Sequence, residues 1–301
     1  MSRKKGLIGM LLFLFILAAM LYALLPWALA QSARAQSEAA ATDTARLSQD
    51  QPAQSLRLPI LMYHHLSQNP AALDDYTISP QQLEQDLTAL KGAGWTPISL
   101  QALIAYGEGK RDLPSKPVLL VFDDGYRSFL TLAFPLLQAH DVPAVVSVIG
   151  EQAEAAQNLG AEPGAFMNWD ELRHVAQSGL VALQSHSAGL HVYHQRPGAA
   201  RLPCESEDAY RQVLLNDIQR MTSLCSQAQI TLQPAFAYPY GQLDATAQSI
   251  LEQSGFLVTM TSEEHVNRIS PHLSSLQSLG RLNRSGSMDT QDVLAWMEGA
   301  S

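Results

Sequence analysis

The stretch from Pro117 to Tyr126 constrains the fold of this chain more than any other. Its first six residues are all apolar and include valine and phenylalanine, which is typical of a strand buried on both faces. The run stops at two adjacent carboxylates, Asp123 and Asp124, followed by Gly125. Both carboxylates should therefore lie at the carboxyl end of the strand, where alternating α/β folds build their sites. Asp-Asp-Gly also suits a tight turn, so this segment alone leaves a site and a plain turn open.

Predicted strands and helices alternate through the rest of the chain. Two helix starts carry capping signals: Ser79 is followed by proline and, three residues on, glutamine, and Asn168 is followed three residues on by glutamate. Strands are predicted at 58–62, 95–98, 117–122, 144–149, 180–184, 235–238, 256–260 and 279–282. Helices are predicted at 79–92, 99–106, 126–139, 169–177, 206–228, 244–254 and 289–297. This alternation predicts one α/β domain with a parallel, barrel-like sheet.

The N-terminal segment differs from the rest. Residues 6–30 are almost entirely apolar and follow three basic residues, which suits a membrane-spanning helix with its N-terminus in the cytoplasm. Small residues near positions 28–35 also suit signal-peptidase cleavage, so residues 1–30 are predicted as a membrane anchor or a signal peptide. Residues 31–57 are predicted as a flexible linker because large apolar side chains are scarce there. Residues 58–301 then form the folded domain, outside the cytoplasm under either interpretation.

The net charge and the two cysteines limit which ligands and cross-links the chain can have. The chain has a formal net charge of −9 at pH 7, which disfavours binding to a nucleic acid backbone. Its two cysteines, Cys204 and Cys225, could form a disulfide outside the cytoplasm or remain free thiols. Their spacing does not match a zinc-finger ligand set.

Two histidines follow the strand predicted at 180–184. His186 and His191 are five residues apart, so they can reach one ion only if the residues between them form a turn. A histidine is more often an ordinary surface or core residue. Two imidazoles and one carboxylate are nevertheless the ligand set of a catalytic zinc-type centre with open positions.

Taken together, these motifs resemble those of the polysaccharide deacetylases of carbohydrate esterase family 4, the NodB-homology group, from about Pro59 to Met297. The family motif Thr-Phe-Asp-Asp-Gly matches residues 121–125 except at its first position. The motif His-Ser/Thr-x-x-His appears at 186–191 with one extra residue. That spacing, with Met-Tyr-His at 62–64, is similar to the branch of extracellular poly-N-acetylglucosamine deacetylases. The resemblance implies a distorted (β/α)7 TIM-like barrel.

The resemblance also implies roles for single residues. Asp123 would be the general base, while Asp124, His186 and His191 would bind a divalent metal, zinc first and nickel, cobalt or iron(II) as alternatives. The third family motif, Arg-x-Pro-Phe/Tyr, aligns on residues 237–241, so the arginine that orients the base is expected to be absent. Pro239 and Tyr240 remain, and the Tyr240 backbone N–H would contribute to an oxyanion hole.

The closing Leu-x-His motif of the family, which supplies the general acid, has no match near residues 279–284. His64 follows the first predicted strand and is the candidate substitute, although it could also be a packed, uninvolved histidine. His65 is expected to point elsewhere. Tyr126 and Trp169 could stack on sugar rings, but packing against the barrel is the commoner role.

The implied function is metal-dependent N-deacetylation, outside the cytoplasm, of a polysaccharide that contains N-acetylglucosamine, such as poly-N-acetylglucosamine or peptidoglycan. The missing arginine and histidine leave open a catalytically weak or inactive glycan-binding module. An esterase acting on acetylated xylan would share the same site.

Overall fold

The computed structural model describes residues 55–159, 165–192 and 196–299. The predicted anchor or signal at 1–30 and the predicted linker up to residue 54 lie outside the described residues. Among the described residues, no helix is long and apolar enough to cross a membrane. The predicted linker ended at residue 57, but strand β1 (Leu56–Leu58) already pairs with β11 (Asn267–Ile269), so the folded domain starts slightly earlier.

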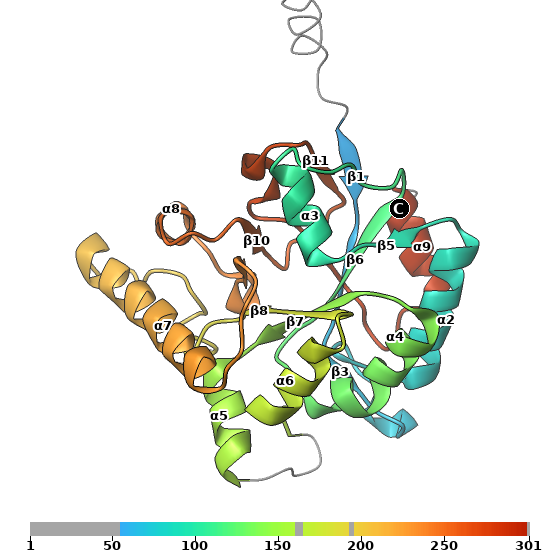
Figure 1. Ribbon diagram of the computed structural model, residues 1–301, viewed down its shortest axis with the longest axis horizontal. Helices are drawn as coiled ribbons and strands as arrows, with labels where there is room; N and C mark the ends of the chain where they lie inside the picture. The colour runs from blue at the N-terminus through green and yellow to red at the C-terminus, as the bar shows by residue number, and fades with distance from the viewer. Residues whose placement is uncertain (1–54, 160–164, 193–195, 300–301) are drawn as a thin grey trace, which may run out of the picture. The chain divides into compact units, whose positions relative to one another are not determined.

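A parallel sheet forms the centre of the described domain (Figure 1). Its strands run in the order β10, β9, β8, β7, β6, β2, β12, and β5 pairs with the start of β6. They are β2 (Ile60–Tyr63), β5 (Thr96–Pro97), β6 (Pro117–Phe122), β7 (Ala144–Val148), β8 (Val181–Ser185), β9 (Ala235–Ala237), β10 (Val258–Met260) and β12 (Leu282–Asn283). Every pair within this sheet is parallel. The sheet curls into a half-barrel, which confirms the predicted barrel-like α/β fold.

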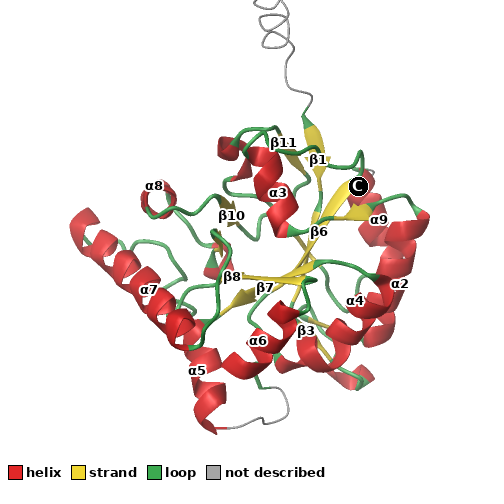
Figure 2. Ribbon diagram, in the orientation of Figure 1, coloured by secondary structure: helices red, strands yellow, loops and turns green. Residues whose placement is uncertain are grey.

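Helices surround the strands (Figure 2). They are α2 (Pro80–Gly92), α3 (Leu100–Gly107), α4 (Phe134–His140), α5 (Gly150–Leu159), α6 (Trp169–Gln177), α7 (Glu207–Gln227), α8 (Ala245–Gln253) and α9 (Thr290–Glu298). The capping boxes predicted at Ser79 and Asn168 are both present. Each cap satisfies backbone N–H groups that the first helical turn leaves without partners.

Several predicted boundaries change for local reasons. Pro59 has no N–H to donate, and it separates β1 from β2 where one strand was predicted. Helix α5 was missed within residues 150–167, because Gly150 and Ala153 are its buried residues and leave little apolar periodicity. The helix predicted at 126–139 begins with a π-helical turn, Phe129–Ala133, before α4. The last strand is Leu282–Asn283 rather than 279–282.

Strand β6 is buried on both faces, as its sequence predicts. Val118, Leu120 and Phe122 belong to the larger core cluster, which includes residues of α2, α4 and α6. Leu119 and Val121 belong to the second cluster, with residues of β9 and β10. Since side chains alternate along a strand, Asp123 follows on the side of Leu119 and Val121.

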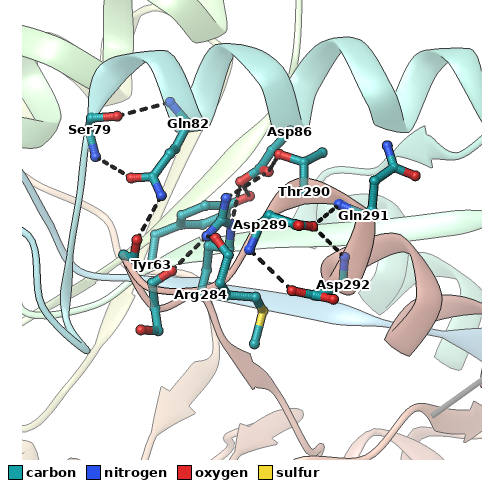
Figure 3. A network of polar contacts seen from close by, with 12 residues as sticks. Tyr63, Ser79, Gln82, Asp86, Arg284, Asp289, Thr290, Gln291 and Asp292 are labelled. Atoms are coloured by element: carbon teal, nitrogen blue, oxygen red, sulfur yellow. Dashed lines mark hydrogen bonds and ion pairs between the residues drawn. The ribbon is translucent and has the colours of Figure 1, made fainter.

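A buried polar network ties α2 and α9 to the end of β12 (Figure 3). Arg284 donates from Nε and Nη2 to the Asp86 carboxylate at 2.8 and 3.2 Å. Tyr63 and Thr290 donate hydroxyl groups to the same carboxylate at 3.3 and 2.6 Å. Because each charge finds several partners, the pair can remain ionised in the core.

Candidate metal centre

The two adjacent aspartates reach one cavity although neighbouring residues of a strand point to opposite faces. Asp123 is the first residue after β6, and its N–H bonds the carbonyl of Tyr63 at 2.8 Å. Asp124 has a φ of 70°, in the left-handed region, so the chain turns immediately after Asp123. Gly125 continues the turn with a φ of 79°. Both carboxylates line the same cavity, which favours the site interpretation of Asp-Asp-Gly.

The two histidines of the second motif meet Asp124 across this cavity. His186 follows β8, and Ser187, with a φ of 72°, turns the chain so that His191 returns beside it. The Nε2 atoms of His186 and His191 each lie 3.4 Å from Asp124 Oδ1. The structure thus brings the three predicted ligand residues together.

The donor atoms of these residues fit a divalent metal. Their ligand atoms all lie within 4.8 Å of one another. Two zinc bonds of about 2.1 Å at a tetrahedral angle would place the bonded atoms about 3.4 Å apart, as observed between Asp124 and each histidine. Asp124 Oδ1 is buried and has no hydrogen-bond partner among the described residues. A buried oxygen of this kind is costly unless a proton, cation or water satisfies it.

Hydrogen bonds on the far side of each ring orient the ligand nitrogens. His186 Nδ1 lies 2.8 Å from the Ala237 carbonyl, which can only accept, so Nδ1 carries the proton. In the neutral ring Nε2 is then left as a lone-pair donor facing Asp124. His191 Nδ1 lies 3.1 Å from the Tyr240 hydroxyl, which can fix the same tautomer.

The electrostatics of the centre favour ionised carboxylates. Burial raises the pKa of Asp123, but Arg281, His186 and His64 outweigh it and hold that pKa well below its usual range. Burial raises the pKa of Asp124, but the nearby imidazoles of His186, His64 and His191 outweigh it and lower that pKa. Burial lowers the pKa of His191, whereas the two aspartates raise the pKa of His186 despite its burial.

An arginine pairs with Asp123, although the sequence led us to expect that the arginine orienting this residue is absent. Arg281 Nη1 lies 2.8 Å from both Oδ1 and Oδ2 of Asp123. Its Nε donates to the Thr261 carbonyl at 2.7 Å, and the side chain is 1% exposed. The third motif lacks its arginine, but a residue just before β12 provides a guanidinium to the same carboxylate. The sequence signal was an arginine inside an otherwise apolar predicted strand, where a buried charge needs a partner.

The cavity around the centre has a volume of about 840 Å³. His64 lies on its wall, and its Nδ1 is buried without a hydrogen-bond partner among the described residues. Burial lowers the pKa of His64, while Asp123 and Asp124 act in the opposite direction. Tyr76, 59% exposed, meets the His64 ring edge to face at 5.0 Å between centroids. Other side chains on the wall, not anticipated from sequence, are those of Asp74, Gln242, Ser262, Glu264 and Asn283.

Other predicted residues have mixed outcomes. The expectation that His65 points elsewhere is wrong: it also lines the cavity, with Nδ1 2.9 Å from Ser128 Oγ. Trp169 packs in the core, as its commoner role predicts. Tyr126 instead lines the cavity, and burial and the nearby Asp124 raise its pKa to about 12.

Residues of the third motif also contribute to the cavity wall. Pro239 starts a short turn, Pro239–Gly241, in which Tyr240 has a φ of 56°. Tyr240 lines the cavity and contacts His191, with ring centroids 4.3 Å apart. Cys204 and Cys225 lie away from this site as free thiols, one exposed and one buried.

The sequence of this chain is similar to those of known polysaccharide deacetylases. A sequence model of the family described as polysaccharide deacetylase matches residues 110–259. The poly-beta-1,6-N-acetyl-D-glucosamine N-deacetylase of Escherichia coli is 27% identical over 243 residues, which cover 73% of this chain and 36% of that protein. The enzyme of the same name from Staphylococcus epidermidis is 23% identical and aligns over 64% of this chain and 63% of its own length. This chain therefore spans about a third of the Escherichia coli relative and under two thirds of the staphylococcal one.

Solved structures share the fold. A de-N-acetylase from Aggregatibacter actinomycetemcomitans superposes with a TM-score of 0.68 at 25% identity, covering 80% of this chain and 99% of that one. IcaB from Ammonifex degensii superposes with a TM-score of 0.67 at 27% identity, covering 81% and 98%. The similarity extends well beyond the span matched by the family model, over most of the described domain.

Proposed function

Because the chain contains a polysaccharide deacetylase domain, we propose that it hydrolyses acetamide groups on N-acetylglucosamine units of a polysaccharide, with poly-N-acetylglucosamine as the first candidate substrate. One observation supports this most strongly. The cavity combines three converging metal-ligand atoms with a second carboxylate, that of Asp123, which is ionised and paired with Arg281. Such a site has separate groups for binding a metal and for accepting a proton.

The proposed metal is a divalent ion held by Asp124, His186 and His191. Two imidazoles and one carboxylate suit zinc, with nickel, cobalt and iron(II) as alternatives. A bound ion of this kind polarises a carbonyl oxygen and lowers the pKa of a water towards about 7. A set of three protein ligands would leave coordination positions of the metal free for water and substrate from the cavity.

Asp123 is the proposed general base. Its carboxylate lies 3.9 Å from His186 Nε2, so it borders the metal position. Arg281 bonds both of its oxygens and holds it ionised, so it can take a proton from a water in the cavity. Its position beside Asp124 lets one strand end supply both a ligand and the base.

His64 is the proposed proton donor to the leaving amine. Since burial lowers its pKa, the ring is neutral at pH 7, so the proton that Asp123 takes from the water must pass to His64 before His64 can protonate the leaving amine. Asp123, which takes up a proton, is close enough to influence the His64 pKa. The Tyr240 backbone N–H, in the turn Pro239–Gly241, is the proposed donor to the developing oxyanion.

The alternative of an inactive glycan-binding module has less support than the sequence suggested. One of its two arguments was the missing arginine, and Arg281 pairs with the base instead. We also propose that the domain acts outside the cytoplasm, because residues 1–30 resemble an export or anchor segment. Cell fractionation of the full chain would test that location.

The direct test measures acetate release from poly-N-acetylglucosamine oligomers by the full chain with and without added zinc. We expect Asp124→Asn to lose both metal binding and turnover, because a ligand is removed. Asp123→Asn should keep the metal and lose turnover by about 100-fold or more, because only the base is removed. Full activity in Asp123→Asn would show that the base is assigned wrongly. Acetate release from acetylated xylan but not from the aminosugar oligomers would favour the esterase.

A further inference from the structure

The loop that carries both proposed histidine ligands is held by its main chain. His186 N–H bonds the Val148 carbonyl at 2.8 Å, which continues the pairing of β8 with β7. Leu190 N–H bonds Ser187 Oγ at 3.1 Å within the loop. Ser187 and Ala188 are fully buried, so their backbone groups need partners within the protein.

The start of α5 supplies donors for two loop carbonyls. The N–H of Gly150 bonds the Ser187 carbonyl at 3.1 Å, and the N–H of Glu151 bonds the Ala188 carbonyl at 2.8 Å. These N–H groups belong to the first turn of the helix, which has no intrahelical acceptors for them. The loop thus provides acceptors for two N–H groups at the start of α5, and these bonds hold two peptide groups of the loop in place.

A single carboxylate satisfies two further donors of the loop. Asp217, on α7, accepts the Ala188 N–H at Oδ2 (2.9 Å) and the Gly189 N–H at Oδ1 (2.8 Å). The Asp217 residue is 8% exposed. Burial raises the pKa of the Asp217 carboxyl, and the two N–H groups act in the opposite direction. The two N–H groups therefore stabilise the buried carboxylate, and the carboxylate in turn holds this part of the loop.

We propose that Asp217 is a positioning residue for the metal centre: by holding Ala188 and Gly189 it sets where His191 returns beside His186. The reason lies in the spacing of the ligands. Four residues separate the two histidines. Ser187 Oγ accepts the Leu190 N–H within the loop, whereas the N–H groups of Ala188 and Gly189 bond Asp217 outside it. The hydrogen bonds of Asp217 go to the main chain of the loop and not to the side chain of a proposed ligand, so any effect on the metal is transmitted through the loop. This inference rests on the proposed metal-dependent function.

The test compares zinc affinity of the full chain and its variants by competition with a chromogenic chelator. Asp217→Asn keeps the shape but turns an NH₂ group towards one of the two N–H donors. We expect its zinc Kd to be about 10- to 100-fold weaker, the usual cost of losing an outer partner of a metal site. Glu154→Gln is the matched control: it removes the same charge from the neighbouring exposed surface of α5 and should change the Kd less than about 2-fold.

Thermal unfolding with and without zinc separates positioning from stability. A lower Tm in the zinc-free variant, with an unchanged zinc Kd, would overturn the proposal and leave Asp217 a structural residue. A weaker Kd with a smaller zinc-induced rise in Tm supports it. If Asp217→Asn does not fold, Asp217→Glu, which moves the carboxylate outward by one methylene, replaces it. The expected loss is then at least about 3-fold, and an unchanged Kd again overturns the proposal.

The parent chain distinguishes this inference from the function on which it depends. A parent that binds zinc while Asp217→Asn binds equally well refutes the positioning role alone. A parent that binds no divalent metal refutes the metal centre, and the positioning role with it.

Discussion

Replacing Arg281 with methionine should destabilise the domain and slow the reaction together. The guanidinium is 1% exposed and lies 2.8 Å from both oxygens of Asp123, whose side chain is 2% exposed. Arg281→Met leaves that carboxylate buried without its cationic partner. Removing one member of a buried ion pair costs about 3–5 kcal/mol. For a domain of this size that corresponds to a fall in Tm of about 6–20 °C.

The pH at which the loss is measured matters. The pKa of Asp123 is lowered in the folded state, so its contribution to stability is complete above the ordinary value of 3.8 and is lost as pH falls through the folded value. Urea unfolding of the metal-free proteins at pH 7 should therefore show the full difference between parent and variant. The difference should shrink as the pH is lowered, because the carboxylate of the variant, without Arg281, gains its proton at a higher pH than that of the parent.

Activity and a second substitution complete the experiment. We expect kcat to fall about 10- to 100-fold in Arg281→Met, because the base loses the group that orients it. Its acidic pH limit should move to higher pH, since the base is no longer held ionised. Arg281→Met with Asp123→Asn removes both charges, so it should be more stable than the sum of the single losses predicts. A single variant within 1 kcal/mol of the parent, or strictly additive losses, would refute the reasoning.

Three further substitutions test other parts of the site, and one labelling experiment tests the state of the two cysteines. His64→Ala should lower kcat about 100-fold or more at unchanged zinc affinity, measured by acetate release and chelator competition. Tyr76→Ala should raise KM for oligomers more than it lowers kcat, because the exposed ring lies at the cavity wall. Gly241→Ala should lower both stability and kcat, since φ is +67° and the new Cβ would lie 2.7 Å from a backbone nitrogen. Iodoacetamide at pH 8 should label Cys204 and spare native Cys225, whose pKa burial raises to about 12, and dithiothreitol should leave Tm unchanged.

Local sequence determined most of the architecture. The apolar run of β6 is buried on both faces, and the caps at Ser79 and Asn168 start helices where they were expected. Such features depend on periodicity and on contacts within a few residues, which a sequence displays directly. Helix α5 was missed because few of its residues face the core.

The convergence of Asp124, His186 and His191 could also be predicted, since each follows a predicted strand of one parallel sheet. Strands of such a sheet end at the same edge, so residues that follow them tend to meet. The sequence therefore allowed us to predict that the residues of the first two motifs lie close together. The sequence did not show how the chain turns between His186 and His191, which are five positions apart.

Tertiary structure alone decided which groups support that site. Arg281 lies 158 positions from Asp123, and Asp217 lies 29 from Ala188, so neither pairing leaves a local pattern. His65 was misjudged for the same reason, because its ring nitrogen contacts Ser128, 63 positions away. A buried charge or N–H must find a partner wherever the fold provides one. The sequence therefore specifies the need for that partner, and only packing selects the residue that meets it.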